Sequence, residues 1–386
     1  MNDVFGTPHS ASSGHATSRP RVAVVFGGRS SEHAISCVTA GSVLAAIDRS
    51  KYDVLPIGIG TDGRWLLVGD DPERLAIQGD KLPAVADVAE SSAPVVLAAD
   101  PTSREITVLE PGALPKLLGE VDVVFPLLHG PYGEDGTFQG FLEMAQVPYV
   151  GSGVLASAAS MDKEYMKALF TGFGLPSGPY ATVRPREWER DPAAVREAVS
   201  SLGFPVFVKP ARAGSSMGIT KVHRVEDLDA AIEEARRHDP KVIVEAMLTG
   251  REIECGVLEF EDGPRASVPA EIRVGGEHEF YDFAAKYLPD NGTELDVPAN
   301  LTKEQTAEVR RLAVAAFEAL SCEGLARVDF FLLDNGTFVI NEVNTMPGFT
   351  PVSMYPTMWQ ATGVEYAELI DRLIQAALRR PNTLLR

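Results

Sequence analysis

The sequence predicts a mixed α/β and α+β protein, with an open α/β layer at the N-terminus followed by smaller α+β units. Two observations support this prediction. The apolar run RVAVVFGG, residues 21–28, leads through a polar loop into the amphipathic segment HAISCVTAGSVLAAI, residues 33–47, which is the pattern of a buried parallel strand followed by a helix. From residue 204 onward, short strand-like runs alternate with single helices and Gly-rich turns, a pattern typical of α+β domains.

We expect four segments along the 386 residues. Residues 1–20 are rich in Ser, Gly, Thr and His, which predicts a disordered tail. Residues 21–151 form the α/β layer, with further strands at YDVLPIGI and VDVVFPLLHG and a variable Pro-, Asp- and Ala-rich stretch at 69–115. Residues 152–245 are expected to form a compact α+β domain, and residues 246–386 a third unit.

Hydrophobic periodicity and end signals predict the elements of these two later units. Helices are expected at 161–174, from about Trp188 to Leu202, at 225–238 and from Thr302 to Leu320. Strands are expected at 204–210, 241–248, 251–260 and 266–272.

Composition narrows the function classes. A formal net charge of -19 argues against a general nucleic-acid binder and against binding to anionic membranes, because both usually need basic patches. No apolar run has the length of a membrane span, and the N-terminus lacks the apolar core of a signal peptide, so we expect a cytoplasmic protein. Cys37, Cys255 and Cys322 show no pairing pattern and are expected to be reduced and packed.

The segment RVDFFLLDNGTFVINEVN, residues 327–344, predicts a β-hairpin. Two apolar runs flank Asn335-Gly336, a dipeptide that favours a two-residue loop. Counting outward from that loop places Asp329 opposite Glu342 and Arg327 opposite Asn344. Because side chains alternate across a strand, these four side chains should project from one face.

Two facing carboxylates repel, so a positive group is expected between Asp329 and Glu342. Carboxylate and amide oxygens are ligands that Mg²⁺ prefers, and Asn344 supplies the amide. The neighbouring Phe331, Phe338 and Ile340 favour a buried face over the alternative, an exposed hairpin whose polar face meets water.

A Gly/Ser loop, GSSMG at 214–218, follows the strand lysine Lys209 and leads into another strand. It is not a Walker A loop, which needs GK[ST] and a following helix. Its backbone N–H groups could wrap phosphate oxygens with Lys209 as a point charge; a plain tight turn is the alternative. Lys163 also adjoins apolar segments, where its ammonium needs an anionic partner or extends to solvent.

Four more candidates lie at strand ends and in one loop. Glu32 stands at a strand-to-helix junction, where it is either a ligand-binding residue or an acid complementing the helix dipole. His129 ends a strand, and a core histidine with satisfied hydrogen bonds is the default interpretation. Lys286 and Tyr287 lie in the long polar loop 281–298, a length typical of lids and binding loops.

These motifs occur in an order that resembles the D-alanine:D-alanine ligases of the ATP-grasp superfamily, from about Val22 onward. The matching landmarks are FGGRSSEHAIS, LHGPYGEDG, GSGVLASAASMDK, VKPARAGSSMGI, VEAMLTGREIE, AAKY, RVDF and NEVNTMPGFTPVS. The resemblance implies an ATP-grasp fold preceded by an open, biotin-carboxylase-like α/β domain, with ATP held between the antiparallel sheets of the central and C-terminal domains.

The resemblance also implies a role for each matched residue. ATP phosphates would contact Lys163, Lys209, Lys286 and the loop with Gly214 and Ser216; Glu245 and the backbone near Leu248 would bind adenine, and Glu252 the ribose. Asp329 and Glu342 would hold one Mg²⁺, and Glu342 and Asn344 a second, for which Mn²⁺ could substitute. Glu32, Ser215 and Tyr287 would surround the first D-alanine, Arg327 and the Gly348 N–H would bind the oxyanion, and Ser353 would join Arg327 at the second carboxylate.

The activity implied by the resemblance is ATP-dependent ligation of two D-alanines to D-alanyl-D-alanine through a D-alanyl phosphate, for peptidoglycan synthesis, by a homodimer. Tyr287 favours the dipeptide, because relatives that make D-alanyl-D-lactate are expected to replace it. Rivals are another ATP-grasp carboxylate–amine ligase, including the depsipeptide-forming type, and a nucleotide-binding regulatory protein on the same scaffold. A periplasmic binding protein would need a secretory signal.

Overall fold

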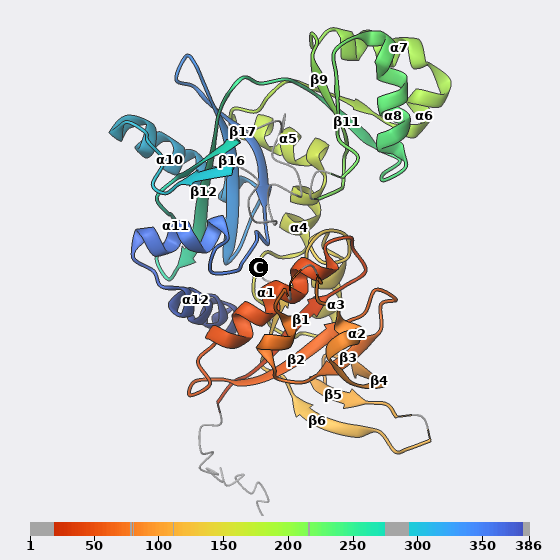
Figure 1. Ribbon diagram of the computed structural model, residues 1–386, viewed down its shortest axis with the longest axis vertical. Coiled ribbons are helices and arrows are strands. Elements are labelled where there is room, and N and C mark those ends of the chain that lie inside the picture. Colours follow the sequence, from red (N-terminus) through yellow and green to blue (C-terminus); the bar gives the residue numbers. More distant parts are fainter. Residues whose placement is uncertain are drawn as a thin grey trace, which may run out of the picture.

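The computed structural model describes residues 19–380 except residues 78, 80, 111, 215, 216 and 275–292. Three β-sheets organise these residues (Figure 1), one in the N-terminal third, a small central one and one in the C-terminal part. The expected tail, residues 1–18 of it, and the expected loop residues Lys286 and Tyr287 lie outside the described residues.

The N-terminal sheet has the strand order β6-β5-β4-β3-β2-β1-β7. Its central strand β1 (Arg21–Gly27) lies between β2 (Asp53–Ile59) and β7 (Val123–Leu127) and pairs with both in parallel. Helix α1 (His33–Ala46) packs on β1. These elements confirm the predicted βα unit, and they bring the carboxyl ends of β1 and β7 side by side, where parallel sheets bind ligands.

Residues 65–120, which include the variable stretch at 69–115, contribute strands that the sequence did not predict. The sheet continues in antiparallel fashion through short, partly exposed strands, in which inward residues such as Val95, Ile106 and Val108 are buried. The added elements are β3 (Trp65–Val68), η1 (Pro72–Leu75), α2 (Val85–Val88), β4 (Ala89–Leu97), β5 (Glu105–Val108) and β6 (Lys116–Glu120).

Three helices follow the first sheet. Helix α3 (Thr137–Met144) packs on the face of this sheet opposite to α1, while α4 (Val154–Met161) and α5 (Lys163–Gly172) bury apolar residues in the core of the third sheet. Asp162 begins α5, because its side chain accepts the backbone N–H groups of Glu164 and Tyr165. Helix α5 is therefore part of the hydrophobic core of the third sheet, in the C-terminal part of the chain.

The central sheet has the order β10-β9-β11-β8 and its own hydrophobic core. The helix predicted from Trp188 to Leu202 is wrong as a single element: it is two helices, because Pro192 cannot continue the first, and Asp191 caps the second by accepting from Ala194 N. The elements are β8 (Tyr180–Val183), α6 (Pro185–Arg190), α7 (Pro192–Ser200), β9 (Val206–Pro210), β10 (Thr220–Val222), η2 (Val225–Asp227), α8 (Leu228–Arg236) and β11 (Val242–Ala246).

The third sheet runs β15-β14-β12-β16-β17, with β13 paired to β12. Helix α10, predicted from Thr302, is confirmed, and Thr302 and Gln305 form a capping box at its start. The elements are β12 (Gly250–Phe260), β13 (Gly263–Ala266), β14 (Ala270–Val274), β15 (Thr293–Asp296), α10 (Lys303–Ala319), β16 (Leu325–Leu333), β17 (Phe338–Asn344), α11 (Met354–Thr362) and α12 (Tyr366–Arg379).

One hydrophobic core joins the two ends of the chain. Helix α12 buries residues such as Leu369 and Leu373 in the same cluster as Val22 and Phe125 of the N-terminal sheet, and it lies beside α1 (Figure 1). Tyr52 donates a hydrogen bond to Asp371 of α12 at 2.7 Å.

The three cysteines are free and buried, as predicted, and burial raises the pKa of each thiol to about 12. In the part of the chain that the structure describes, no helix has the length and apolar character needed to cross a membrane.

Candidate active site

The hairpin of β16 and β17 has the predicted pairing at its far end. Arg327 faces Asn344 and Asp329 faces Glu342. The turn differs from the prediction: the loop has three residues, 334–336, since Leu333 N donates to Thr337 O at 3.0 Å and Gly336 adopts a positive φ of 82°. That geometry is typical of a type I turn with a glycine bulge.

A β-bulge compensates for the longer turn. Pairing shifts by one residue between Asp329 and Phe330, which leaves Asn341 as the extra residue of β17. Because the turn and the bulge each shift the register by one residue, in opposite directions, the predicted pairing of Asp329 with Glu342 is confirmed although the two-residue loop was wrong.

The bulge also decides which side chains face the ligand cavity. Ile340 pairs with Phe330, and both belong to the core beneath the sheet. Glu342 pairs with Asp329, the neighbour of Phe330, so Glu342 and Ile340 project from opposite faces. The expectation that Phe338 and Ile340 mark the face of Glu342 is therefore wrong; the bulge at Asn341 moves the strand from an apolar to a polar face.

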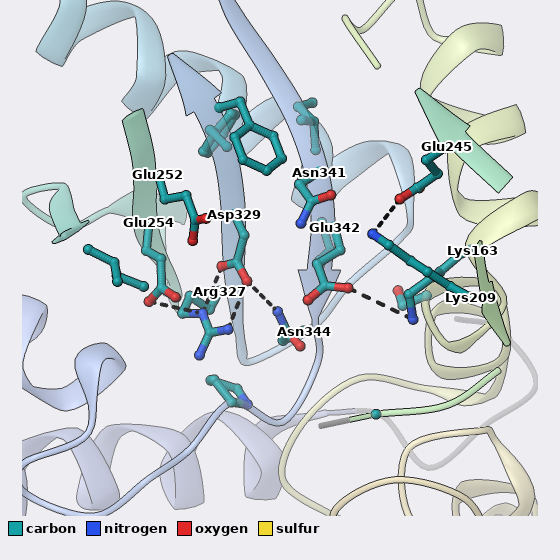
Figure 2. A pocket seen from close by; sticks show the side chains of 18 of the residues that line it. Lys163, Lys209, Glu245, Glu252, Glu254, Arg327, Asp329, Asn341, Glu342 and Asn344 are labelled. Carbon is teal, nitrogen blue, oxygen red and sulfur yellow. Dashed lines mark hydrogen bonds and ion pairs between the residues drawn. The ribbon is translucent and has the colours of Figure 1, made fainter. Parts of the chain in front are cut away.

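A cation occupies the space between carboxylates on this face (Figure 2). Arg327 makes a two-fold contact with Asp329, at 2.7 Å from Nε and 2.8 Å from Nη2, and its Nε lies 3.1 Å from Glu254 Oε2. Asn344 Nδ2 donates to Asp329 at 3.0 Å. Burial alone would lower the pKa of Arg327, but Asp329 and Glu254 raise it well above its ordinary value, so this guanidinium stays charged.

A cavity of about 470 Å³ lies between the central and third sheets and reaches the N-terminal loops. Every predicted site residue that the structure describes lines it: Glu32, Lys163, Lys209, Gly214, Glu245, Leu248, Glu252, Arg327, Asp329, Glu342, Asn344, Gly348 and Ser353. The four remaining predicted residues, Ser215, Ser216, Lys286 and Tyr287, lie outside the described residues.

Lys163 stands at the start of α5 and reaches the hairpin. Its ammonium lies 3.9 Å from Glu342 and donates to the Ala213 carbonyl at 3.0 Å, just before the Gly/Ser loop (Figure 2). The ammonium is therefore directed at the anionic partner that the sequence required rather than at solvent.

Lys209 and Glu245 form an ion pair at 2.5 Å on neighbouring strands of the central sheet (Figure 2). Burial opposes ionisation of Glu245, but Lys167 and Lys209 outweigh it and hold the pKa of this carboxyl well below its usual range. Apolar side chains line the cavity beside this pair: Phe207, Met217, Met247 and Leu248. An apolar slot edged by one carboxylate suits a flat base that carries an amino group.

Glu32 lies at the N-cap of α1, and its side chain forms no capping hydrogen bond there. It is 8% exposed, and backbones approach it from two loops. A Cβ added to Gly130 or to Gly214 would lie 2.7 Å from Glu32 Oε2. Glycine at these positions lets both loops meet at this carboxylate.

Gly348 and Ser353 lie together in the loop after β17. A Cβ on Gly348 would be 3.2 Å from Ser353 Oγ, and Ser353 Oγ accepts Thr350 N at 3.1 Å. Both residues line the same cavity as Arg327.

Four titratable residues that line the cavity were not among the predicted site residues, namely Lys167, Glu254, His129 and Glu134. Lys167 and Glu254 had a signal, since each repeats a predicted residue at the period of its element, four after Lys163 in α5 and two after Glu252 in β12.

The other two missed residues bind one loop of the third unit. His129, expected to be an ordinary core residue, contacts the Met346 carbonyl through Nδ1 at 3.1 Å. Glu134 accepts Gly130 N at 2.7 Å and Met346 N at 3.2 Å. Burial and the nearby charge of Glu32 raise the pKa of Glu134 to about 8.

The charge of the cavity wall suits added cations. Its described residues include seven carboxylates against four cationic side chains, and an entering nucleotide adds negative charge. Among the described residues no group of three or more His, Cys, Asp or Glu side chains could hold a metal by itself. Mg²⁺ needs no such group, because it binds through one or two carboxylates, waters and substrate phosphates. Asp329, Glu342 and Asn344 match that donor set.

Comparisons with known proteins agree with this geometry. Residues 21–152 match the family described as "D-ala D-ala ligase N-terminus", and residues 169–375 match "D-ala D-ala ligase C-terminus". The chain belongs to the D-alanine–D-alanine ligase family. Its fold is accordingly the ATP-grasp fold with an N-terminal α/β domain.

Relatives of the family cover nearly the whole chain. A D-alanine–D-alanine ligase of Streptomyces griseus is 69% identical over 380 residues, 97% of each chain, and one of a Mycobacterium species is 57% identical over 368 residues, 94% of this chain and 97% of that one.

Solved structures of the family superpose on this fold. The VanG D-Ala:D-Ser ligase of Enterococcus faecalis has a TM-score of 0.81 at 36% identity, covering 93% of this chain and 100% of that one. The D-alanine–D-alanine ligase of Coxiella burnetii has a TM-score of 0.78 at 34% identity, covering 93% and 94%.

Proposed function

We propose that this protein joins two D-alanines to D-alanyl-D-alanine with ATP as the energy source, in the cytoplasm, for peptidoglycan synthesis. The observation that carries the proposal is the polar face of the hairpin, where Arg327, Asp329, Glu342 and Asn344 converge in a cavity that also holds a candidate adenine slot. High identity to D-alanine–D-alanine ligases over the whole chain supports the choice of substrate.

The first step activates a carboxylate, which is a poor acyl donor at neutral pH. A carboxylate oxygen of the first D-alanine attacks the γ-phosphorus of ATP, the bond to the ADP oxygen breaks, and a D-alanyl phosphate forms. Lys163 and Lys209 line the cavity and would bind phosphate oxygens, and Lys286 would join them. Two Mg²⁺, held by Asp329, Glu342 and Asn344, would neutralise the phosphate charge.

The second step forms the amide bond. The second D-alanine loses a proton from its ammonium group, its amine attacks the acyl carbon, and phosphate leaves from the tetrahedral intermediate. Arg327 and the Gly348 N–H would stabilise the oxyanion, and Ser353 would help to bind the second carboxylate. Glu32, with Ser215 and Tyr287, would orient the first D-alanine.

Water would destroy the acyl phosphate, so the reaction needs a closed cavity. We assign that role to the Gly/Ser loop at 214–218 and to the loop 281–298. We also propose domain boundaries at residues 151 and 245, with the exception that α4 and α5 pack in the core of the third sheet. We also propose a homodimer, as in the family expectation.

The experiment is phosphate release from ATP and Mg²⁺ with D-alanine, D-serine, D-lactate or L-alanine, with the product identified by mass. We expect release with D-alanine and a product with the mass of D-alanyl-D-alanine. Release only with D-alanine plus D-serine or D-lactate would reassign the second substrate. Nucleotide binding without phosphate release from any pair would favour the regulatory alternative and overturn the proposal.

A further inference from the structure

Helix α5 directs two lysines into the cavity, and only the first matches a family motif. Lys163 and Lys167 lie one helical turn apart, so they share a face of α5. Lys167 Nζ lies 2.9 Å from Glu245 Oε1 and donates to the Asn341 carbonyl at 3.4 Å. The Lys167 side chain is 3% exposed. A lysine this buried is retained only where it has a fixed anionic partner.

The two lysines on Glu245 differ in position. Lys167 binds one carboxylate oxygen from α5, whose apolar residues pack in the third-sheet core. Lys209 binds the other oxygen from β9 of the central sheet, and its side chain is 16% exposed. Lys209 can therefore turn toward a phosphate in the cavity, whereas Lys167 is held between Glu245 and the bulge residue Asn341.

We infer that Lys167 is a positioning residue for nucleotide recognition: it stays paired with Glu245 and keeps that carboxylate ionised when Lys209 moves to the ATP phosphates. The inference rests on the proposed use of ATP. Without Lys167, the departure of Lys209 would leave a buried carboxylate unpaired, which strongly opposes nucleotide binding.

The protonation of Glu245 bears on which purine is accepted. An ionised carboxylate only accepts hydrogen bonds, so it binds the 6-amino group of adenine and repels the 6-oxo group of hypoxanthine. A protonated carboxyl can donate to a 6-oxo group. Loss of Lys167 raises the proton affinity of Glu245 and should weaken the preference for adenine.

The test is Lys167→Met, which keeps chain length and removes the charge. ATP and ITP affinities are measured by calorimetry with Mg²⁺ and without D-alanine. We expect ATP to bind about tenfold more weakly and the ATP-to-ITP preference to fall about fivefold or more, with the KM for D-alanine unchanged.

A matched control is available in the same region. Lys241 is a half-buried lysine that ties the central unit to the start of α5, at 2.6 Å from Asp162 and 2.9 Å from Glu164, but it does not contact Glu245. Lys241→Met should leave the ATP-to-ITP preference within about twofold of the parent value. An equal loss of preference in both variants would mean a general structural effect and would overturn the inference.

A double variant keeps the test decisive if Lys167→Met does not fold. Lys167→Met combined with Glu245→Gln removes the unpaired carboxylate, and ATP should bind to it as it binds to Glu245→Gln alone, within about twofold. A double variant that binds ATP much more weakly than Glu245→Gln would show that Lys167 acts by another route.

Failure of this inference is distinguishable from failure of the proposed function. Parent-like ATP and ITP affinities in Lys167→Met would refute the inference while dipeptide synthesis by the parent still stood. A parent that binds ATP selectively but makes no dipeptide would refute the proposed reaction and leave the role of Lys167 intact.

Discussion

The two ends of the cavity have inverse charge arrangements. At the hairpin end, the cation Arg327 lies among carboxylates, Asp329 and Glu254. At the other end, the carboxylate Glu245 lies between two cations, Lys167 and Lys209. The carboxylates that pair with Arg327 come from β12 and β16 of one sheet, whereas Glu245 joins strands of the central sheet to α5.

This difference separates two tasks. Groups fixed by the register of one sheet keep their geometry without reorganisation, which suits stabilisation of a transition state. Groups contributed by separate units change partners when those units or a ligand move, which suits binding and closure. We therefore expect substitutions at the hairpin end to lower turnover, and substitutions around Glu245 to lower nucleotide affinity.

The largest effect is expected from the facing carboxylates. Asp329→Asn and Glu342→Gln should each lower kcat about a hundredfold or more at saturating ATP and Mg²⁺, because each removes a charged ligand of the proposed metal site. The matched control is Asp334→Asn, which removes an exposed carboxylate from the turn of the same hairpin. This variant should keep a kcat close to the parent value. Near-normal kcat in Asp329→Asn or Glu342→Gln would contradict the assignment of turnover to the hairpin end of the cavity.

Arg327→Lys should have the next largest effect. Lysine cannot reproduce the two-fold contact of the guanidinium with Asp329, so kcat should fall about tenfold to a hundredfold. The Kd for ATP should stay within about twofold of the parent value, since the adenine end is untouched. If calorimetry shows ATP affinity falling as much as turnover, the two ends are not separate in function.

Glu134 on the cavity wall gives a prediction for the pH dependence of stability. The pKa of Glu134 is raised from 4.5 to about 8, so the folded state binds the proton more tightly than the unfolded chain does. Its contribution to stability is fully present below pH 4.5 and is lost as the pH rises toward 8.

Glu134→Gln imitates the protonated form and should reduce this pH dependence, whose slope for one group is at most about 1.4 kcal/mol per pH unit. Urea unfolding at several pH values within that window measures the effect. An unchanged slope would mean that Glu134 is already ionised in the native protein.

The smallest effect is expected at the hairpin turn. Gly336 has a positive φ of 82°, and a Cβ added there would meet no atom within 4 Å. Gly336→Ala should therefore cost only the backbone strain, about 1 kcal/mol in the free energy of unfolding. Gly140, inside α3 with equally open space, is the control, and Gly140→Ala should be neutral or stabilising. A large loss of turnover in Gly336→Ala would show that the turn, rather than the bulge, sets the register at Asp329.

Sequence patterns predicted many of the regular elements, because long apolar runs and clear caps have few alternative structures, but they did not predict α3, α4, α11 or α12. They failed where short strands are partly exposed, as at 89–120, and where Pro192 divides a helical pattern. The hairpin shows a different limit. Neither the type of turn nor the bulge at Asn341 has a distinct residue signature here. Their two shifts of register cancel, so Asp329 still pairs with Glu342 as predicted.

For the candidate site, motifs located residues that one cavity brings together, but they did not indicate which residues pair with each other. Lys167 was not predicted because a lysine on a helix usually extends to solvent, and only the packed structure places it against Glu245. The roles of Ser215 and Tyr287 stay predictions.

The hydrophobic core that α12 shares with the first sheet has a consequence for synthesis of the protein. Tyr52 and Asp371 bond across 319 positions of sequence, so the ribosome releases β1 and α1 long before the helix that covers them. A nascent chain ending before residue 366 exposes the apolar surface that α12 buries, and such surfaces promote aggregation. The first layer to be made is thus among the last to complete its core.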